Sequence, residues 1–336
     1  MSGIKVAVVG AGMMGRGIAA CIAAGGAHEV WLCARRKEAA AEGVQKANEL
    51  VDFLAANGVA APTRGRIIPT TSLQEAVAGA EFVFESIAED LGAKQALFAE
   101  LEAMASPTAV LCTNTSSLSV SAISSGCRGA GADRVVAAHF IGPAHLVPLV
   151  ELCPSERAAA HTARIAGGAS QGPIARVRRF LESIGKKPVV LTKEIDGFIA
   201  ARLQAALYRE CLHLVESGVA DCEAIDGAVY NGFGRRLNQI GPFLQADFAG
   251  VDLVQRTHAA FFPQLGAYQR DVRADKLVAE GRLGVKALKG HYDWTEAKVK
   301  EVSGRRDAEL LRRLKADRAG DAAAASGDAK RTRSAL

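Results

Sequence analysis

The sequence has few of the features that mark membrane, nucleic-acid-binding and metal-binding proteins. No apolar window reaches the roughly 20 residues that a membrane-spanning helix needs. Aromatic residues make up only 5% of the chain and no basic run alternates with them, so the net charge of +5 does not predict nucleic-acid binding. The seven cysteines are odd in number and contain no CxxC pair. We therefore expect a protein without membrane, nucleic-acid or metal partners, whose thiols are buried in a reducing compartment.

Apolar periodicity is also absent at the end of the sequence, where residues 319–336 are AGDAAAASGDAKRTRSAL. This composition predicts a disordered tail, which we place at residues 306–336. The final Ser-Ala-Leu differs from a peroxisomal Ser-Lys-Leu signal at its middle residue. We therefore expect a cytoplasmic or organelle-matrix protein, with a peroxisomal location as the weaker alternative.

Short apolar runs alternate with helix-like stretches through the first half of the chain. We expect a helix at residues 37–57. Where residues 155–176 are rich in Ala and Gly, we expect an enlarged surface loop or a frayed helix start. Strands that alternate with helices predict an α/β fold with a parallel, doubly wound sheet of the Rossmann type. The strand-like runs lie at residues 4–9, 29–34, 81–87, 108–113, 134–140 and 146–152.

The strand signal ends near residue 192, and from Gly197 onward the sequence has the periodicity of helices. We therefore place a Rossmann-type domain at residues 1–192 and an all-α domain at residues 193–305. The Lys186-Lys187 pair just before this boundary is expected to lie in a solvated turn.

The first strand leads directly into the glycine pattern of a dinucleotide-binding turn. The segment GAGMMG matches GxGxxG and opens an Ala-rich helix. Gly10 permits the tight turn, Gly12 lets the backbone approach a pyrophosphate, and Gly15 lets helix and strand pack closely. Amide groups at the start of the helix then face the anion. We expect these glycines, with Met13 and Met14 between them, to bind the cofactor.

The acid that an NAD site usually carries at the end of the second strand is missing. In NAD-binding chains this acid accepts a hydrogen bond from the ribose 2′-hydroxyl, and it would repel a 2′-phosphate. Here the strand ends in Ala34, followed by Arg35 and Arg36, which can pair with a phosphate. The sequence therefore favours NADP(H). The alternative is that both arginines are solvated residues at a helix start and that NAD(H) binds.

Seven segments, in order along about residues 3–295, resemble the L-3-hydroxyacyl-CoA dehydrogenase family. The form PAHLVPLVEL and the single helical domain are most similar to its lambda-crystallin branch, which includes L-gulonate 3-dehydrogenases. The segments are GAGMMGRGIA, ESIAEDLGAK (85–94), NTSSLSV (114–120), AHFIGPAHLVPLVEL (138–152), GFIAARL (197–203), GFGRRLNQIGPF (232–243) and KALKGHYDW (286–294).

The resemblance implies a catalytic role for three residues. His139 matches the family's catalytic base, and Glu151 matches the carboxylate that orients it. Ser116 matches the serine that hydrogen-bonds the substrate oxygen. This assignment suits the chemistry, because removal of a hydroxyl proton needs a base that titrates near neutral pH, and a carboxylate holds the imidazole in one tautomer. A competing interpretation makes Ser116 the N-cap of the helix that follows it.

The resemblance also implies cofactor contacts and exposes one departure. Asn114 is expected near the nicotinamide, and Glu89 and Lys94 on the side of its ribose. The family motif GFIxNR has an Asn that contacts the catalytic histidine and the substrate, whereas this chain has Ala201 at that position. Loss of one donor of this kind can cost about 10²–10³ in rate.

Taken together, the motifs predict an NAD(P)-dependent oxidoreductase that interconverts a 3-hydroxyacyl-CoA, or a short 3-hydroxy acid, and its 3-oxo form. The resemblance implies a role in fatty acid metabolism, a small-molecule substrate and a homodimer assembled through the helical domain. Two alternatives remain: an L-gulonate-type 3-dehydrogenase, and a weakly active nucleotide-binding protein of the crystallin kind. The presence of Ser116, His139 and Glu151 counts against the second alternative, because a protein without catalysis has no need of all three residues.

Overall fold

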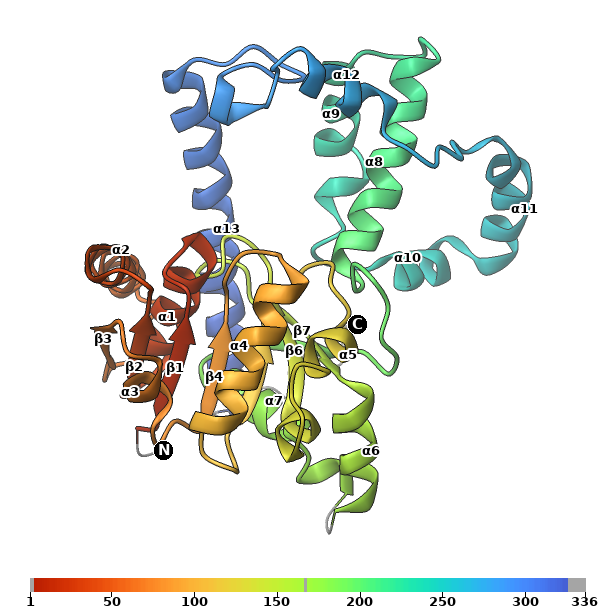
Figure 1. The fold of residues 1–336 in the computed structure, drawn as a ribbon. Coiled ribbons are helices and arrows are strands. Elements are labelled where there is room, and N and C mark those ends of the chain that lie inside the picture. Colours follow the sequence, from red (N-terminus) through yellow and green to blue (C-terminus); the bar gives the residue numbers. More distant parts are fainter. Residues whose placement is uncertain (1–2, 166–167, 326–336) are drawn as a thin grey trace. The chain divides into compact units, whose positions relative to one another are not determined.

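The computed structural model describes residues 3–165 and 168–325, and it divides into two compact units (Figure 1). The first unit contains the described residues up to Ile199 together with those from Arg305 onward, and the second spans Ala200–Gly304. The division follows Ile199 and not residue 192, because residues 192–199 are tied to the first unit: the Ser121 hydroxyl donates to Glu194 and the Ile199 amide donates to Glu151.

The first unit is built on one sheet of eight strands in the order β3-β2-β1-β4-β5-β6-β7-β8. All neighbouring strands pair in parallel except β6 and β7, which are antiparallel. The predicted parallel sheet is therefore correct apart from this pair, whose eight-residue connection, residues 141–148, has no room for a crossover helix. The strands are β1 Lys5–Val9, β2 Glu29–Cys33, β3 Arg66–Thr70, β4 Phe82–Glu85, β5 Val110–Thr113, β6 Val135–Phe140, β7 Leu149–Pro154 and β8 Lys187–Val190.

Helices cover both faces of this sheet, as the doubly wound prediction requires. Strand residues alternate between the two faces: Val6 and Val8 of β1 pack with α1, α2 and α7, while Ala7 and Val9 pack with α3, α4 and α5. The helices are α1 Met13–Gly25, α2 Lys37–Ala56, α3 Leu73–Val77, α4 Leu91–Met104, α5 Val120–Ser124, α6 Glu156–Arg164 and α7 Pro173–Ser183.

Two segments contain more helix than the sequence predicted: residues 155–176, expected to be a surface loop or a frayed helix start, and the expected disordered tail. Within residues 155–176, α6 begins after Ser155, whose hydroxyl accepts from the Ala158 amide, and α7 begins at Pro173. The predicted tail is helical as far as Ala325 in α13 (Glu296–Ala325), because Leu314 is buried in the core of the first unit and the Ala-rich sequence favours a helix. The rest of that tail lies outside the described residues.

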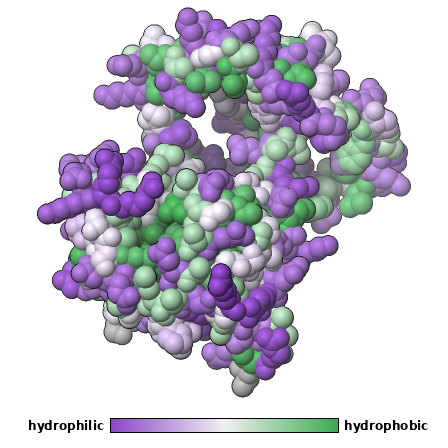
Figure 2. Space-filling model, in the orientation of Figure 1, coloured by the Kyte–Doolittle hydropathy of each residue, from purple (hydrophilic) through white to green (hydrophobic). Residues whose placement is uncertain are grey.

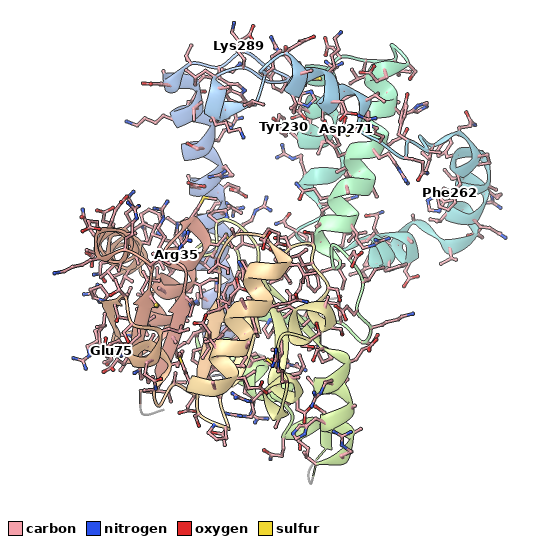
Figure 3. All side chains as sticks on the ribbon, in the orientation of Figure 1. Arg35, Glu75, Tyr230, Phe262, Asp271 and Lys289 are labelled. Atoms are coloured by element: carbon pink, nitrogen blue, oxygen red, sulfur yellow. The ribbon has the colours of Figure 1, made fainter. Side chains whose placement is uncertain are left out.

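The second unit is helical, as predicted, and its described residues bury few large side chains. Only Leu212 and Ile225 among its large apolar residues are buried, whereas Phe243 is 88% exposed. Figure 2 shows apolar side chains on its surface, and Phe262 is marked in Figure 3. Its helices are α8 Ala200–Glu216, α9 Cys222–Asn231, α10 Pro242–Ala249, α11 Val251–Phe261 and α12 Val272–Ala279.

Across both units, none of the helices within residues 3–165 and 168–325 combines the length and the apolar character that crossing a membrane requires.

Candidate active site

A cavity of about 1320 Å³ opens at the carboxyl ends of β1, β2, β4 and β5. The strand order reverses between β1 and β4, and in doubly wound sheets ligands bind at such a switch point. The predicted site residues that line this cavity are Gly10, Gly12, Met13, Met14, Arg35, Arg36, Glu89, Asn114 and Ser116. The predicted residues that do not line it are Gly15, Lys94, His139 and Glu151.

The glycine turn after β1 forms one wall of the cavity, and each glycine has a distinct reason to be there. Gly10 has φ +109, and a side chain there would collide with the Ser86 carbonyl oxygen. A side chain at Gly15 would collide with the Gly10 carbonyl oxygen. A Cβ at Gly12, in contrast, would meet no protein atom within 4 Å, and no side chain caps the start of α1. The first amides of α1 are therefore available to an anion.

Two positively charged residues that follow β2 line the cavity. Arg35 and Arg36 are both exposed, and Arg36 is the residue from which α2 starts (Figure 3 marks Arg35). Among the described residues that line the cavity, the carboxylates are Glu89 and Glu100, which come from other elements. The structure thus places no acid at the end of β2, in agreement with the sequence.

Glu89 holds the part of the cavity wall that contains Ser116 and Ser117. Its Oε1 accepts hydrogen bonds from the Thr115 hydroxyl at 2.6 Å and from the amides of Ser116 and Ser117 at 2.9 and 3.0 Å. Burial would raise the pKa of Glu89, but these hydrogen bonds together with the Lys94 ammonium lower the pKa below its ordinary value. Glu89 is therefore ionised at neutral pH, and it holds the loop that carries Ser116.

Lys94 lies behind this wall and does not face the cavity, contrary to the expectation that it lines the ribose side. Its Nζ is 2.6 Å from Glu85 Oε1 and 3.4 Å from Glu89 Oε2, and the side chains of both Lys94 and Glu85 are buried. Glu85 also accepts from the Thr113 hydroxyl at 2.6 Å and the Ile87 amide at 2.8 Å. Sequence analysis missed Glu85, although it begins the ESIAED segment that was singled out.

His139 and Glu151 form a buried pair through the antiparallel pairing of β6 with β7. The register places His139 directly opposite Glu151, so both side chains lie on the same face of the sheet. Imidazole Nδ1 is 2.9 Å from Glu151 Oε2, and the Ile199 amide donates to the other carboxylate oxygen at 2.9 Å. A carboxylate only accepts hydrogen bonds, so the imidazole tautomer that suits this contact has its proton on Nδ1 and leaves Nε2 free to exchange one.

Asn114 connects this pair to the cavity. It lines the cavity, and its Oδ1 accepts from the backbone amide of Phe140, the residue after His139, at 2.8 Å. Ser116 is exposed and lines the same cavity. The N-cap interpretation of Ser116 is wrong: Ser119 caps α5, because its hydroxyl accepts from the Ala122 amide at 3.0 Å.

The turn that follows β6 rests on a buried lysine that sequence analysis placed in solvent. Lys186 is 6% exposed, and its Nζ donates to the Ala144 and Val147 carbonyl oxygens. A cation that bonds two carbonyls of residues 144–147 holds the connection between the strands of His139 and Glu151. The prediction of a solvated turn at Lys186 is therefore wrong, since a Lys-Lys sequence does not reveal which side chain points inward.

Two family descriptions match the chain. Residues 5–195 match "3-hydroxyacyl-CoA dehydrogenase, NAD binding domain", and residues 197–294 match "3-hydroxyacyl-CoA dehydrogenase, C-terminal domain". The boundary between the two matches lies close to the division between the two units.

Three similar proteins are all named as dehydrogenases, of different substrates. The chain is 27% identical to 5-formyl-3-hydroxy-2-methylpyridine 4-carboxylate 5-dehydrogenase of Mesorhizobium japonicum, over 91% of this chain and 96% of that protein. It is 30% identical to the L-carnitine dehydrogenase of Bacillus cereus, over 91% of this chain and 90% of that protein. It is 32% identical to the 3-hydroxyadipyl-CoA dehydrogenase of Escherichia coli, over 86% of this chain and 58% of that protein.

A solved structure agrees with the family matches. A crystal structure of a 5-formyl-3-hydroxy-2-methylpyridine 4-carboxylic acid 5-dehydrogenase, described as an NAD+-dependent dismutase, aligns with this chain at a TM-score of 0.84 and 26% identity. The alignment covers 93% of this chain and 99% of that chain. Both family descriptions, a relative of 30% identity that is covered over nine tenths of its length, and the cavity beside the glycine turn lead to the same result. The predicted family is confirmed: the chain belongs to the 3-hydroxyacyl-CoA dehydrogenase family and is an NAD-dependent oxidoreductase.

Proposed function

We propose that this oxidoreductase interconverts the 3-hydroxy and 3-oxo forms of a 3-hydroxyacyl-CoA or a short 3-hydroxy acid. The observation that carries the proposal is the buried His139–Glu151 pair, joined through Phe140 to Asn114 on the wall of the cavity. A nicotinamide dinucleotide fits the cavity, because an uncapped helix start and the open space at Gly12 suit its pyrophosphate. When bound, the nicotinamide supplies hydride transfer.

In the direction of oxidation, Nε2 of the His139 imidazole accepts the proton of the substrate hydroxyl. Glu151 holds Nδ1–H and favours the imidazolium that results, because a carboxylate beside the ring stabilises its positive charge. Ser116 donates to the substrate oxygen as it becomes a carbonyl oxygen. Reduction returns the proton from His139. Since oxidation releases a proton, higher pH favours oxidation and lower pH favours reduction.

Asn114, Glu89 and Lys94 act on the cofactor side of the reaction. Asn114, whose Oδ1 accepts from the Phe140 amide, lines the cavity, and its amide group would lie near the nicotinamide of a bound cofactor. Glu89 lines the cavity, where it would face the ribose of a bound nicotinamide, and the hydrogen bond that it accepts from the Ser116 amide keeps the Ser116 loop in place. Lys94 acts through Glu89 and Glu85, because its ammonium lies behind the wall.

The substrate class is tested by measuring the absorbance change of NADH and NADPH with acetoacetyl-CoA, acetoacetate and the oxidised form of L-gulonate. The names of the L-carnitine and 3-hydroxyadipyl-CoA dehydrogenases support a 3-hydroxy compound that carries a carboxyl or thioester group. We expect turnover with acetoacetyl-CoA or acetoacetate. Preference for the gulonate pair would place the chain in the lambda-crystallin branch, and no turnover with any substrate would favour the nucleotide-binding alternative.

The cofactor preference is a separate proposal: we expect NADPH to bind about tenfold or more tightly than NADH. Arg35 and Arg36 can form charge-assisted hydrogen bonds with a 2′-phosphate, and such bonds are worth about 1.5–3 kcal/mol. Ala34→Asp should reverse the preference by repelling that phosphate. Fluorescence titration gives both Kd values, and Ala78→Asp adds the same charge at an exposed position outside the cavity. Equal Kd values for the two cofactors in the unchanged protein would refute the preference.

We also propose that the chain forms a homodimer through its helical unit. Within the described part of this unit, α10 and α11 have no buried residues, and Phe243, Phe248 and Val251 are each more than 60% exposed. Exposed apolar surface of this extent marks an association site. Light scattering at micromolar concentration should give twice the 35.1 kDa chain mass.

A single charge should disrupt this dimer. Phe248→Asp is expected to shift the mass toward the monomer, because the carboxylate would lose its hydration in the interface. Val189→Asp places the same charge on an exposed residue of β8 in the first unit and should leave the mass unchanged. A monomeric mass for the unchanged protein would contradict the proposal.

A further inference from the structure

Phe198 combines features that do not usually occur together. It is 2% exposed, and its φ of +48 lies in the left-handed region, which bulky residues avoid. Gly197 before it has φ +77, so two successive residues are left-handed. The Phe198 ring lies nearly parallel to the His139 imidazole, with ring centroids 5.3 Å apart and planes inclined by 24°. A strained backbone at a buried residue persists only where its surroundings hold it there, and such residues gather at functional sites.

The turn that contains Phe198 is fixed at both ends by carboxylates. At its start, Glu194 accepts from the Ser121 hydroxyl at 2.6 Å and the Ser121 amide at 3.1 Å. At its end, the Ile199 amide donates to Glu151 at 2.9 Å. Between these points the Phe198 amide donates to the Ile195 carbonyl oxygen at 3.2 Å. The left-handed conformation is therefore the one that lets this short turn bind Glu151 and press an aromatic ring on His139.

We propose that Phe198 is a positioning residue for His139, an inference that rests on the proposed role of His139 as the base. The hydrogen bond to Glu151 fixes Nδ1, but the ring can still tilt about the line from Nδ1 to Oε2. A flat ring packed against one imidazole face blocks that tilt and keeps water from that face. Nε2 then points in one direction, as proton transfer to a positioned substrate requires.

The competing explanation is that Phe198 only fills the apolar core that covers this face of the sheet, in which Leu191 is another member. Three variants separate the two explanations. Phe198→Leu keeps an apolar side chain but removes the flat ring. Phe198→Tyr keeps the ring. Phe198→Gly suits the left-handed backbone and removes the ring. It therefore shows whether the turn without the ring is sufficient to maintain kcat.

The kinetic test compares kcat, KM and cofactor Kd. We expect Phe198→Leu and Phe198→Gly to lose about 10–100-fold in kcat, the scale at which a displaced catalytic group costs rate, while KM and cofactor Kd change little. Phe198→Tyr should keep kcat within a few-fold of the unchanged protein. Folded Phe198→Leu with an unchanged kcat would overturn the inference.

A spectroscopic test does not depend on activity. In protein labelled at histidine, the His139 ring signals are identified by their loss in His139→Gln. The stacked ring should shift the His139 ring-proton signals upfield, and Phe198→Leu should remove that shift while Phe198→Tyr keeps it. Identical His139 signals in Phe198→Leu and the unchanged protein would overturn the inference. Full activity of His139→Gln would instead refute the proposed function, so the two failures can be told apart.

Discussion

His139→Gln is expected to lose about 10³-fold or more in kcat and to bind the cofactor as before. General-base catalysis contributes about 10²–10⁴ in rate, and Gln keeps a similar shape but cannot accept the substrate proton. Cofactor affinity should persist, because the glycine turn and the arginines after β2 line the cavity, whereas His139 does not. Steady-state kinetics with a saturating cofactor gives kcat, and fluorescence titration gives the cofactor Kd.

Glu151→Gln serves as the graded comparison for this experiment. The imidazole remains, and an amide oxygen can still accept from Nδ1, but the neutral amide does not stabilise the imidazolium. We therefore expect a smaller loss in kcat than for His139→Gln. If folded His139→Gln, saturated with cofactor, turns over like the unchanged protein, His139 is not the base.

Lys94→Met is expected to destabilise the first unit by about 3–5 kcal/mol. Its Nζ is 2.6 Å from Glu85, and the two side chains are 1% and 0% exposed. Removing one partner of a buried ion pair leaves the other charge in the interior without compensation, which is strongly destabilising. Glu89 would also lose a neighbouring cation, so the loop that carries Ser116 should loosen.

The stability measurement must report the first unit alone. The chain has two tryptophans, Trp31 in β2 and Trp294 in the second unit, so in a Trp294→Phe background denaturant unfolding followed by fluorescence reports Trp31. The double variant Lys94→Met with Glu85→Gln should recover part of the loss, since it removes the fully buried unpaired charge of Glu85 and leaves only the partly exposed Glu89 without its cation.

An exposed pair is the control for this prediction. Arg178 and Glu182 are one helical turn apart on α7 and both are exposed, so Arg178→Met should cost less than about 1 kcal/mol. A loss for Lys94→Met no greater than that for Arg178→Met would show that the buried pair does not hold the wall of the cavity.

Local signals were sufficient to predict the Rossmann unit. A β-branched run, a glycine turn and an Ala-rich helix follow one another within 25 residues, and each depends only on near neighbours. β3 was missed because its sequence, RIIPT, contains Pro69, which a strand tolerates here at the edge of the sheet. The helix after residue 306 was missed because it depends on distant packing: Leu314 is a single buried residue in a charged segment.

The candidate site was predictable mainly where a motif carried it. His139 and Glu151 came from the resemblance, since a spacing of twelve residues indicates a contact only once β6 and β7 are known to be antiparallel. Phe198 could not be predicted, because its part depends on a left-handed backbone that only the preceding Gly197 hints at. Glu85 was missed because its partner Lys94 was assigned to the cofactor and not to the interior.

The central claim is that this chain moves a hydride between C3 of a 3-hydroxy substrate and a nicotinamide, with His139 moving the proton. The most direct measurement is isotope transfer: 3-hydroxybutyryl-CoA carrying deuterium at C3 is incubated with the protein and either NAD+ or NADP+, and the reduced cofactor is analysed by NMR. We predict deuterium at C4 of the reduced nicotinamide with the unchanged protein and almost none with His139→Gln. Absence of deuterium from the nicotinamide, also with free 3-hydroxybutyrate as the donor, or equal transfer by His139→Gln, would contradict the account.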